Sequence, residues 1–132
     1  MDMQIRFPGN RRVDAEFGGF TVRTDQSKES GGDGSAPSPF SLFLASLGTC
    51  SGYYVLAFCA KRGIPTDDIT LALSADRDPE SHMVKEIKMQ IELPASFPAQ
   101  YVDACVKSAA QCAVKKHLAD APQVTIGAHR AA

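Results

Sequence analysis

Alternating apolar and polar residues mark the first quarter of the chain as short strands. Residues 3–7, 13–17 and 20–22 follow a period of two, which is the period of a strand with one covered face. A Pro-Gly-Asn turn at 8–10 and a Gly-Gly pair at 18–19 separate the three runs, and a Gly-Gly pair is a good hairpin turn. The pattern predicts a three-stranded antiparallel meander.

The longest apolar run, residues 39–63, predicts one long helix. Ser38 suits the N-cap and Pro39 the first helical position, while Gly63 followed by Pro65 ends the helix. About 24 residues of helix span roughly 36 Å. Apolar residues lie on nearly every face, so we expect a buried central helix. The hydroxyl side chains in the middle of the run argue against a membrane span.

Two strands and a second helix follow. Strands are expected at 69–76 and 84–93, the latter with a clear period of two. A helix is expected from about 96 to 118, and a last short strand at 123–127. The apolar stripe of this helix consists of Val102, Cys105, Val106, Ala109, Cys112 and Ala113. The order βββ-α-ββ-α-β predicts an α+β fold in a single domain, 1–132, with antiparallel sheet, a long buried central helix and a second helix.

The connection at 26–37 is polar and rich in glycine. Its Gly-Gly-Asp-Gly sequence is not a phosphate loop, because no Lys-Ser/Thr pair follows and no helix opens directly on the glycines. We expect a mobile loop that can cover a pocket.

Composition excludes several classes of function. The net charge is −1, so there is no basic surface for nucleic acid. The N-terminus has no basic segment followed by an apolar one, and we expect a cytoplasmic protein. The four cysteines form no CxxC pair and the three histidines are far apart, so neither a metal site nor a disulfide scaffold is expected.

The cysteines are therefore either small buried core residues or redox groups. Cys50 and Cys59 lie about 13.5 Å apart along one helix, and Cys105 and Cys112 about 10.5 Å apart if theirs is continuous. A disulfide needs Cα atoms roughly 4.4–6.8 Å apart, so it would have to join the two helices. Small residues surround Cys50 and Cys112, which favours this pair.

The two cysteine motifs resemble those of a known family. They are SPFSLFLASLGTC at 38–50 and CAVKKHL at 112–118, with 62 positions between the cysteines. This spacing, and the expected order of strands and helices, is similar to that of the OsmC/Ohr family, named for osmotically inducible protein C and the organic hydroperoxide resistance protein. The resemblance spans essentially the whole chain and implies an intertwined homodimer with two active sites at the subunit interface.

The resemblance also implies an activity in oxidative or osmotic stress defence. Cys50 would attack an organic hydroperoxide and become a sulfenic acid, and Cys112 would resolve it as a disulfide. No bound cofactor is implied, since an external dithiol, lipoyl-type in the Ohr branch, would restore both thiols. The partners implied are a second copy of the chain and a small-molecule hydroperoxide, with no nucleic acid and no membrane.

One family feature is missing from this sequence. Hydroperoxide-reducing members use an arginine near the first hairpin turn and a glutamate ten residues before the first cysteine. Arg11 matches the arginine, with Arg12 as the near alternative and a surface role open for both, but the glutamate position holds Phe40. This residue resembles the less characterised OsmC-like branches.

Phe40 is also expected to contribute to the substrate pocket. We expect it to line an apolar pocket with Phe43, Leu47 and Tyr53, favouring bulky organic hydroperoxides. The alternative is a module of the same fold that binds a small apolar ligand or senses redox state without turnover.

Overall fold

The structure is a computed structural model that describes residues 1–132. It divides into two compact units, residues 1–46 and 47–132. One helix, α1 (Pro39–Lys61), begins in the first unit and continues into the second. The single domain expected for 1–132 stays a prediction.

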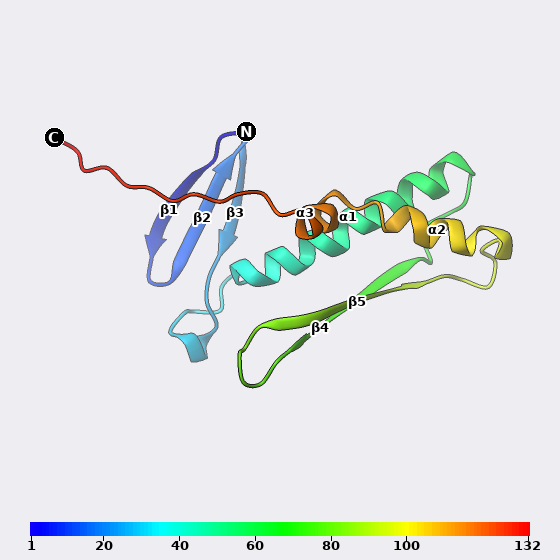
Figure 1. Cartoon of the computed structure of the whole chain (residues 1–132), viewed down its shortest axis with the longest axis horizontal. Coiled ribbons are helices and arrows are strands. Elements are labelled where there is room, and N and C mark those ends of the chain that lie inside the picture. The colour runs from blue at the N-terminus through cyan, green and yellow to red at the C-terminus, as the bar shows by residue number, and fades with distance from the viewer. The chain divides into compact units, whose positions relative to one another are not determined.

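The first unit opens with the predicted meander (Figure 1). Its strands are β1 (Gln4–Gly9), β2 (Arg12–Phe17) and β3 (Phe20–Thr24), paired antiparallel in the order β1-β2-β3. The turn between β2 and β3 contains Gly18 and Gly19 with φ of 55° and 80°. Residues with side chains rarely adopt such angles, which explains the Gly-Gly pair.

The loop after β3 is organised around Asp25, which is fully buried. Its carboxylate accepts hydrogen bonds from the Ser35 hydroxyl (2.6 Å), the Ser35 backbone N–H (3.0 Å) and the Gln26 N–H (2.7 Å). These bonds, the Ser35 hydroxyl foremost, lower the pKa of Asp25 to about 2. A short 3-10 turn, η1 (Lys28–Ser30), lies within the loop. The segment therefore follows a defined hydrogen-bonded path, where the sequence predicted a mobile one.

Helix α1 begins and ends as predicted. The Ser38 hydroxyl accepts the N–H of Ser41 at 3.2 Å, which caps the N-terminus. Gly63 adopts a φ of 64°, and the N–H of Ile64 bonds back to the Cys59 carbonyl, so the helix ends in a left-handed glycine. By length and composition alone this helix could cross a membrane, a property that core helices of soluble proteins share.

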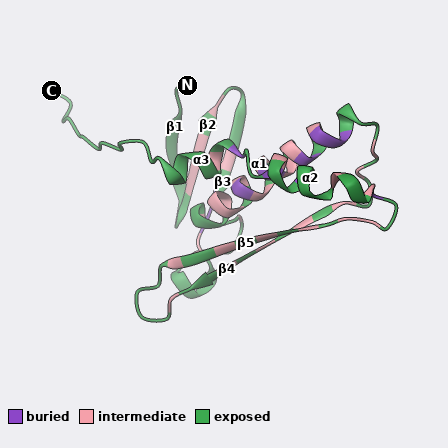
Figure 2. Ribbon diagram, turned by 45° about the vertical axis from the view of Figure 1, so that its right-hand side comes forward, coloured by how far each residue is buried: buried purple, intermediate pink, exposed green.

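Within the single chain, α1 is buried along one stripe: Leu47, Ser51, Val55, Phe58 and Cys59. Tyr53 and Leu56 on other faces are 63% and 51% exposed. Figure 2 shows the alternation of buried and exposed segments along α1.

The second unit packs a hairpin and two short helices against this stripe of α1. Strands β4 (Thr70–Arg77) and β5 (Val84–Glu92) pair antiparallel. The cross-strand pair Leu71↔Ile91 is partly buried against the core. The buried core consists of Val55, Phe58, Cys59, Phe97, Cys105 and Ala109.

The second predicted helix, 96–118, is interrupted. It consists of a 3-10 turn, η2 (Ala99–Tyr101), followed by α2 (Val102–Ala109) and α3 (Ala113–Ala119). The break lies at Cys112, whose backbone has φ −47° and ψ 123°. The strand expected at 123–127 is absent, because residues 121–132 are exposed and unpaired. The α+β class is confirmed, with two antiparallel sheets and three α-helices.

Candidate functional site

The break between α2 and α3 places the Cys112 sulfur against α1. Cys112 is fully buried and is the N-cap of α3. Its sulfur accepts the backbone N–H of Lys115 at 3.4 Å, and its thiol donates to the Leu47 carbonyl on α1 at 3.9 Å. The sequence predicted Cys112 on the stripe of a continuous helix, and this is wrong. The residue ends one helix and begins the next.

Cys50 lies beside this sulfur. It is partly buried on α1, three residues after Leu47, whose carbonyl accepts the Cys112 thiol, and its thiol is one of the neighbours that lower the pKa of Cys112. Both cysteines are free. The structure thus brings together two thiols that are 62 positions apart in the sequence, and we call them the thiol pair.

The surroundings of Cys112 favour its thiolate. Burial raises the pKa of the Cys112 thiol, but neighbouring donors act in the opposite direction, and the pKa ends below its ordinary value. The Lys115 N–H, which reaches the sulfur at 3.4 Å, lowers the pKa most, followed by the side chains of Cys50 and Ser51 and the Val114 N–H. Donors aimed at a sulfur stabilise its negative charge, which explains the direction of this shift.

Ser51 is a site residue that the sequence did not single out. It is 1% exposed, and its hydroxyl has no hydrogen-bond partner at ordinary distance. The hydroxyl still lies close enough to the Cys112 sulfur to favour a thiolate there. An unpaired buried hydroxyl costs about 1–3 kcal/mol. The only signal in the sequence was a serine next to a candidate thiol in an apolar helix.

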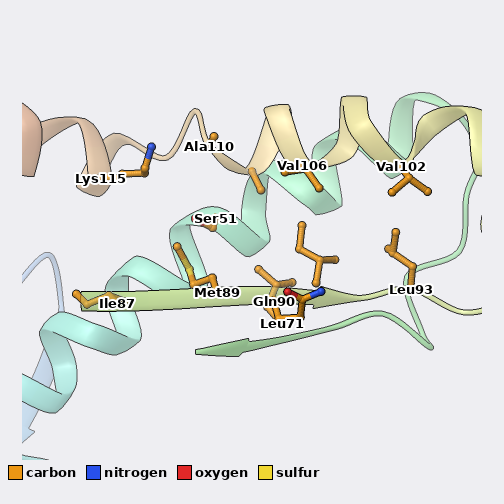
Figure 3. A pocket seen from close by; sticks show the side chains of 12 residues that line it. Ser51, Leu71, Ile87, Met89, Gln90, Leu93, Val102, Val106, Ala110 and Lys115 are labelled. Atoms are coloured by element: carbon orange, nitrogen blue, oxygen red, sulfur yellow. The ribbon is translucent and has the colours of Figure 1, made fainter. Parts of the chain in front are cut away.

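Ser51 also lines a cavity of about 400 Å³ in the second unit. The cavity lies between the hairpin and the helices, with Met89 from β5 and Val106 from α2 on opposite sides (Figure 3). Most of the lining is apolar, and the polar groups are Ser51, Gln90 and Lys115. Such a lining suits an apolar molecule with one polar end.

The four residues predicted to line the substrate pocket are not among those around this cavity. In the first unit, Phe40 and Phe43 pack their rings together with centroids 5.4 Å apart. In the second unit, Leu47 is 2% exposed, whereas Tyr53 is 63% exposed with its ring edge-on to Tyr54. Their pocket stays a prediction.

The candidate arginines are both tied to the glycine-rich loop. Arg12 forms an ion pair with Asp33 at 2.9 Å, and the Arg11 guanidinium lies beside Gly31. The hydrogen bond from Arg12, together with a weaker one from Asn10, lowers the pKa of Asp33. A carboxylate therefore does orient Arg12, although it comes from the loop and not from position 40. A role of either arginine toward Cys50 stays a prediction.

The other two cysteines, Cys59 and Cys105, are fully buried in the core of the second unit, and we call them the core thiols. Burial raises the pKa of both. Protonated and shielded sulfurs of this kind are inert. The pKa of these two thiols is therefore shifted in the opposite direction from that of Cys112.

The chain thus combines an α+β fold, four free thiols and an apolar cavity that Ser51 lines, although neither Cys50 nor Cys112 is among its lining residues. The family model described as OsmC-like protein matches residues 32–127. The chain therefore belongs to the OsmC family, as its cysteine motifs predicted. A search of curated proteins returned no match.

Solved structures share the fold. A protein of Psychrobacter arcticus described as an osmotic stress induced and detoxification response protein has 20% identity and a TM-score of 0.75, covering 86% of this chain and 85% of its own. An OsmC-like protein of Mycoplasma pneumoniae has 13% identity and a TM-score of 0.72, and the match covers 91% of this chain and 87% of that protein. An organic hydroperoxide resistance protein OsmC of Legionella pneumophila has 21% identity and a TM-score of 0.53, and the match covers 89% of each chain.

Proposed function

We propose that this protein is a thiol-dependent peroxidase that reduces organic hydroperoxides in oxidative or osmotic stress defence. One arrangement carries the proposal: the buried Cys112 sulfur accepts the Lys115 N–H at 3.4 Å and has a lowered pKa, to which the neighbouring Cys50 thiol contributes. Membership of the OsmC family supports a redox role in stress. A fold shared with a protein named for organic hydroperoxide resistance agrees with it.

The two-cysteine cycle uses both members of the thiol pair. The Cys50 thiolate attacks the terminal oxygen of the hydroperoxide, the O–O bond breaks, and Cys50 becomes a sulfenic acid while an alkoxide leaves. The Cys112 sulfur then attacks the Cys50 sulfur and expels hydroxide, leaving a disulfide. An external dithiol, lipoyl-type by family resemblance, reduces this disulfide by exchange and is itself oxidised.

Cys50 is assigned the attack because of its exposure. Cys112 is fully buried, whereas Cys50 is partly exposed. A peroxide can therefore reach Cys50, while the Cys112 sulfur is shielded until the sulfenic acid forms next to it.

The cavity beside Ser51 supports an organic substrate over hydrogen peroxide. Its lining is mostly apolar and its volume is about 400 Å³, so a bulky hydrocarbon group gains from burial there. Each buried methylene contributes about 0.8 kcal/mol. Hydrogen peroxide has no such group and forgoes this gain.

We also propose that the working form is a homodimer in the cytoplasm. The exposed apolar side chains include Leu56 on α1 and Val102 and Val106 on α2. A second copy of the chain is the occupant that the OsmC family suggests for such surfaces. A molar mass from light scattering equal to that of one chain would refute the dimer.

The activity is tested with reduced protein and cumene hydroperoxide, following peroxide consumption and free thiols. The parent should consume peroxide with a dithiol and form the Cys50–Cys112 disulfide. Cys50→Ser should lose the reaction, and Cys112→Ser should stop at a sulfenic acid that dimedone traps. Cys105→Ala, which removes a core thiol, is the matched control and should retain turnover. Peroxide consumption by Cys50→Ser at the parent's rate would refute the assignment.

A second function, ligand binding without turnover, is favoured by the same cavity and by Phe40 in place of the family glutamate. It predicts that an apolar ligand binds the reduced protein and that excess cumene hydroperoxide leaves every thiol unchanged. Thiol counts after peroxide treatment therefore separate the two functions.

A further inference from the structure

The proposed cycle leaves one buried polar group without a task. The Ser51 hydroxyl is the one buried side-chain oxygen or nitrogen in the chain that lacks a hydrogen-bond partner. Native proteins pair nearly all such groups, so an exception calls for an explanation. Ser51 directly follows Cys50 and lines the cavity (Figure 3).

The ordinary partner of a helical serine is already engaged. A serine inside a helix usually turns its hydroxyl back to the carbonyl four residues earlier, which for Ser51 is that of Leu47. This carbonyl accepts the thiol of Cys112. The Ser51 hydroxyl is left between the Cys112 sulfur and the cavity, two neighbours that both belong to the proposed reaction.

The reaction has a need that the attacking Cys50 sulfur alone does not meet. Breaking the O–O bond of an alkyl hydroperoxide releases an alkoxide, which is a strong base and leaves slowly unless it receives a proton. The departing oxygen is formed beside Cys50, in a site that is closed to water on the Cys112 side because that residue is fully buried.

We propose that Ser51 is a further catalytic residue, whose hydroxyl gives its proton to the departing alkoxide while it takes the proton of the Cys112 thiol. This inference rests on the proposed peroxidase function. It assigns the unpaired hydroxyl to a bond that forms only when substrate is present.

The step balances in atoms and charge. Cys50 thiolate, Cys112 thiol and hydroperoxide give Cys50 sulfenic acid, Cys112 thiolate and alcohol, with the Ser51 hydroxyl restored. The Cys112 thiolate then attacks the sulfenic acid sulfur, and the disulfide and hydroxide result. The lowered pKa of Cys112 serves both steps, because it makes the thiol a better acid and leaves it as the nucleophile.

The test compares two leaving groups on three proteins. Cumene hydroperoxide releases an alkoxide that needs a proton, whereas peroxybenzoic acid releases a carboxylate that needs none. The proteins are the parent, Ser51→Ala and the control Ser46→Ala. Ser46 lies on the same helix, and its hydroxyl donates to the Phe43 carbonyl at 2.7 Å. The measurement is the single-turnover rate of sulfenic acid formation, in a Cys112→Ser background and in the full chain.

Ser51→Ala in the full chain should slow the reaction with cumene hydroperoxide by about 10²-fold, which is the usual scale of general acid catalysis. Its rate with peroxybenzoic acid should stay within about threefold of the parent's rate. Ser46→Ala should match the parent with both. Ser51→Thr, which keeps a hydroxyl, should recover most of the loss. In the Cys112→Ser background the slowing caused by Ser51→Ala should shrink, because the thiol that supplies the proton is gone.

Two results would overturn the inference while leaving the function intact: equal slowing with both peroxides, which marks a structural role, or no slowing with either. A parent protein that oxidises no thiol with either peroxide would remove the proposed function, and this inference with it. Cooperative thermal unfolding of each variant shows that it is folded before rates are compared.

Discussion

Replacing Cys112 by alanine or by serine separates its structural role from its chemical one. The sulfur caps α3 by accepting the Lys115 N–H, and it is fully buried against the Leu47 carbonyl. Alanine loses the cap, which is worth about 1 kcal/mol, and leaves the space of one buried atom, worth about 1 kcal/mol more. Serine offers an oxygen to Lys115 and a hydrogen to Leu47, so we expect it to lose under about 1 kcal/mol.

Both variants lose the disulfide, but only alanine should loosen α3. We expect the alanine variant to unfold about 4–6 °C below the serine variant, since 1 kcal/mol corresponds to roughly 3–5 °C in a chain of this length. The assay is thermal and urea unfolding of the reduced proteins, with hydrogen exchange of the α3 amides as a local measure. Equal midpoints, or faster exchange in the serine variant, would show that the sulfur is not the cap that holds α3.

Three further predictions concern the rest of the chain. The pKa of Asp25 is about 2 in the fold against 3.8 in an unfolded chain. Its contribution to stability is therefore present above about pH 4 and is lost as the pH falls toward 2. Asp25→Asn should make the melting temperature decline less steeply over this pH range. A Cβ at Gly32 would collide with the Gln26 carbonyl, so Gly32→Ala should lower the free energy of unfolding by about 1–3 kcal/mol. A Cβ at Gly52 in α1 would meet no atom within 4 Å, so Gly52→Ala should raise it by up to about 1 kcal/mol. Urea unfolding measures both changes. The core thiols should resist an aromatic disulfide reagent until the protein is denatured, because burial shields them and raises their pKa; their rapid reaction in the native protein would contradict this expectation.

Local patterns were sufficient where local forces decide the structure. The period of two predicted both hairpins, and Ser38 and Gly63 correctly marked the ends of α1. The break at Cys112 was not predictable in this way, because the apolar stripe passes through it at helical spacing and neither glycine nor proline stands nearby. The break depends on a contact with α1 that no local pattern contains.

The same distinction applies to the candidate site, where local patterns predicted some residues and missed others. Small neighbours and spacing pointed to Cys50 and Cys112, and the structure places the Cys112 sulfur against Leu47, three residues before Cys50. Ser51 escaped notice because a helical serine normally satisfies itself on the main chain. Asp33 escaped notice because its ion pair with Arg12 joins residues 21 positions apart, across a loop whose path the sequence left open.

The contact from the Cys112 thiol to the Leu47 carbonyl links several of these features. It joins the break between α2 and α3 to α1, three residues before Cys50, and it engages the carbonyl that a helical serine at position 51 would normally use. In the proposed cycle, disulfide formation removes the thiol hydrogen, so Leu47 loses that donor and its carbonyl becomes available to Ser51. The serine hydroxyl is then unpaired only in the reduced protein, which is the state that meets the peroxide.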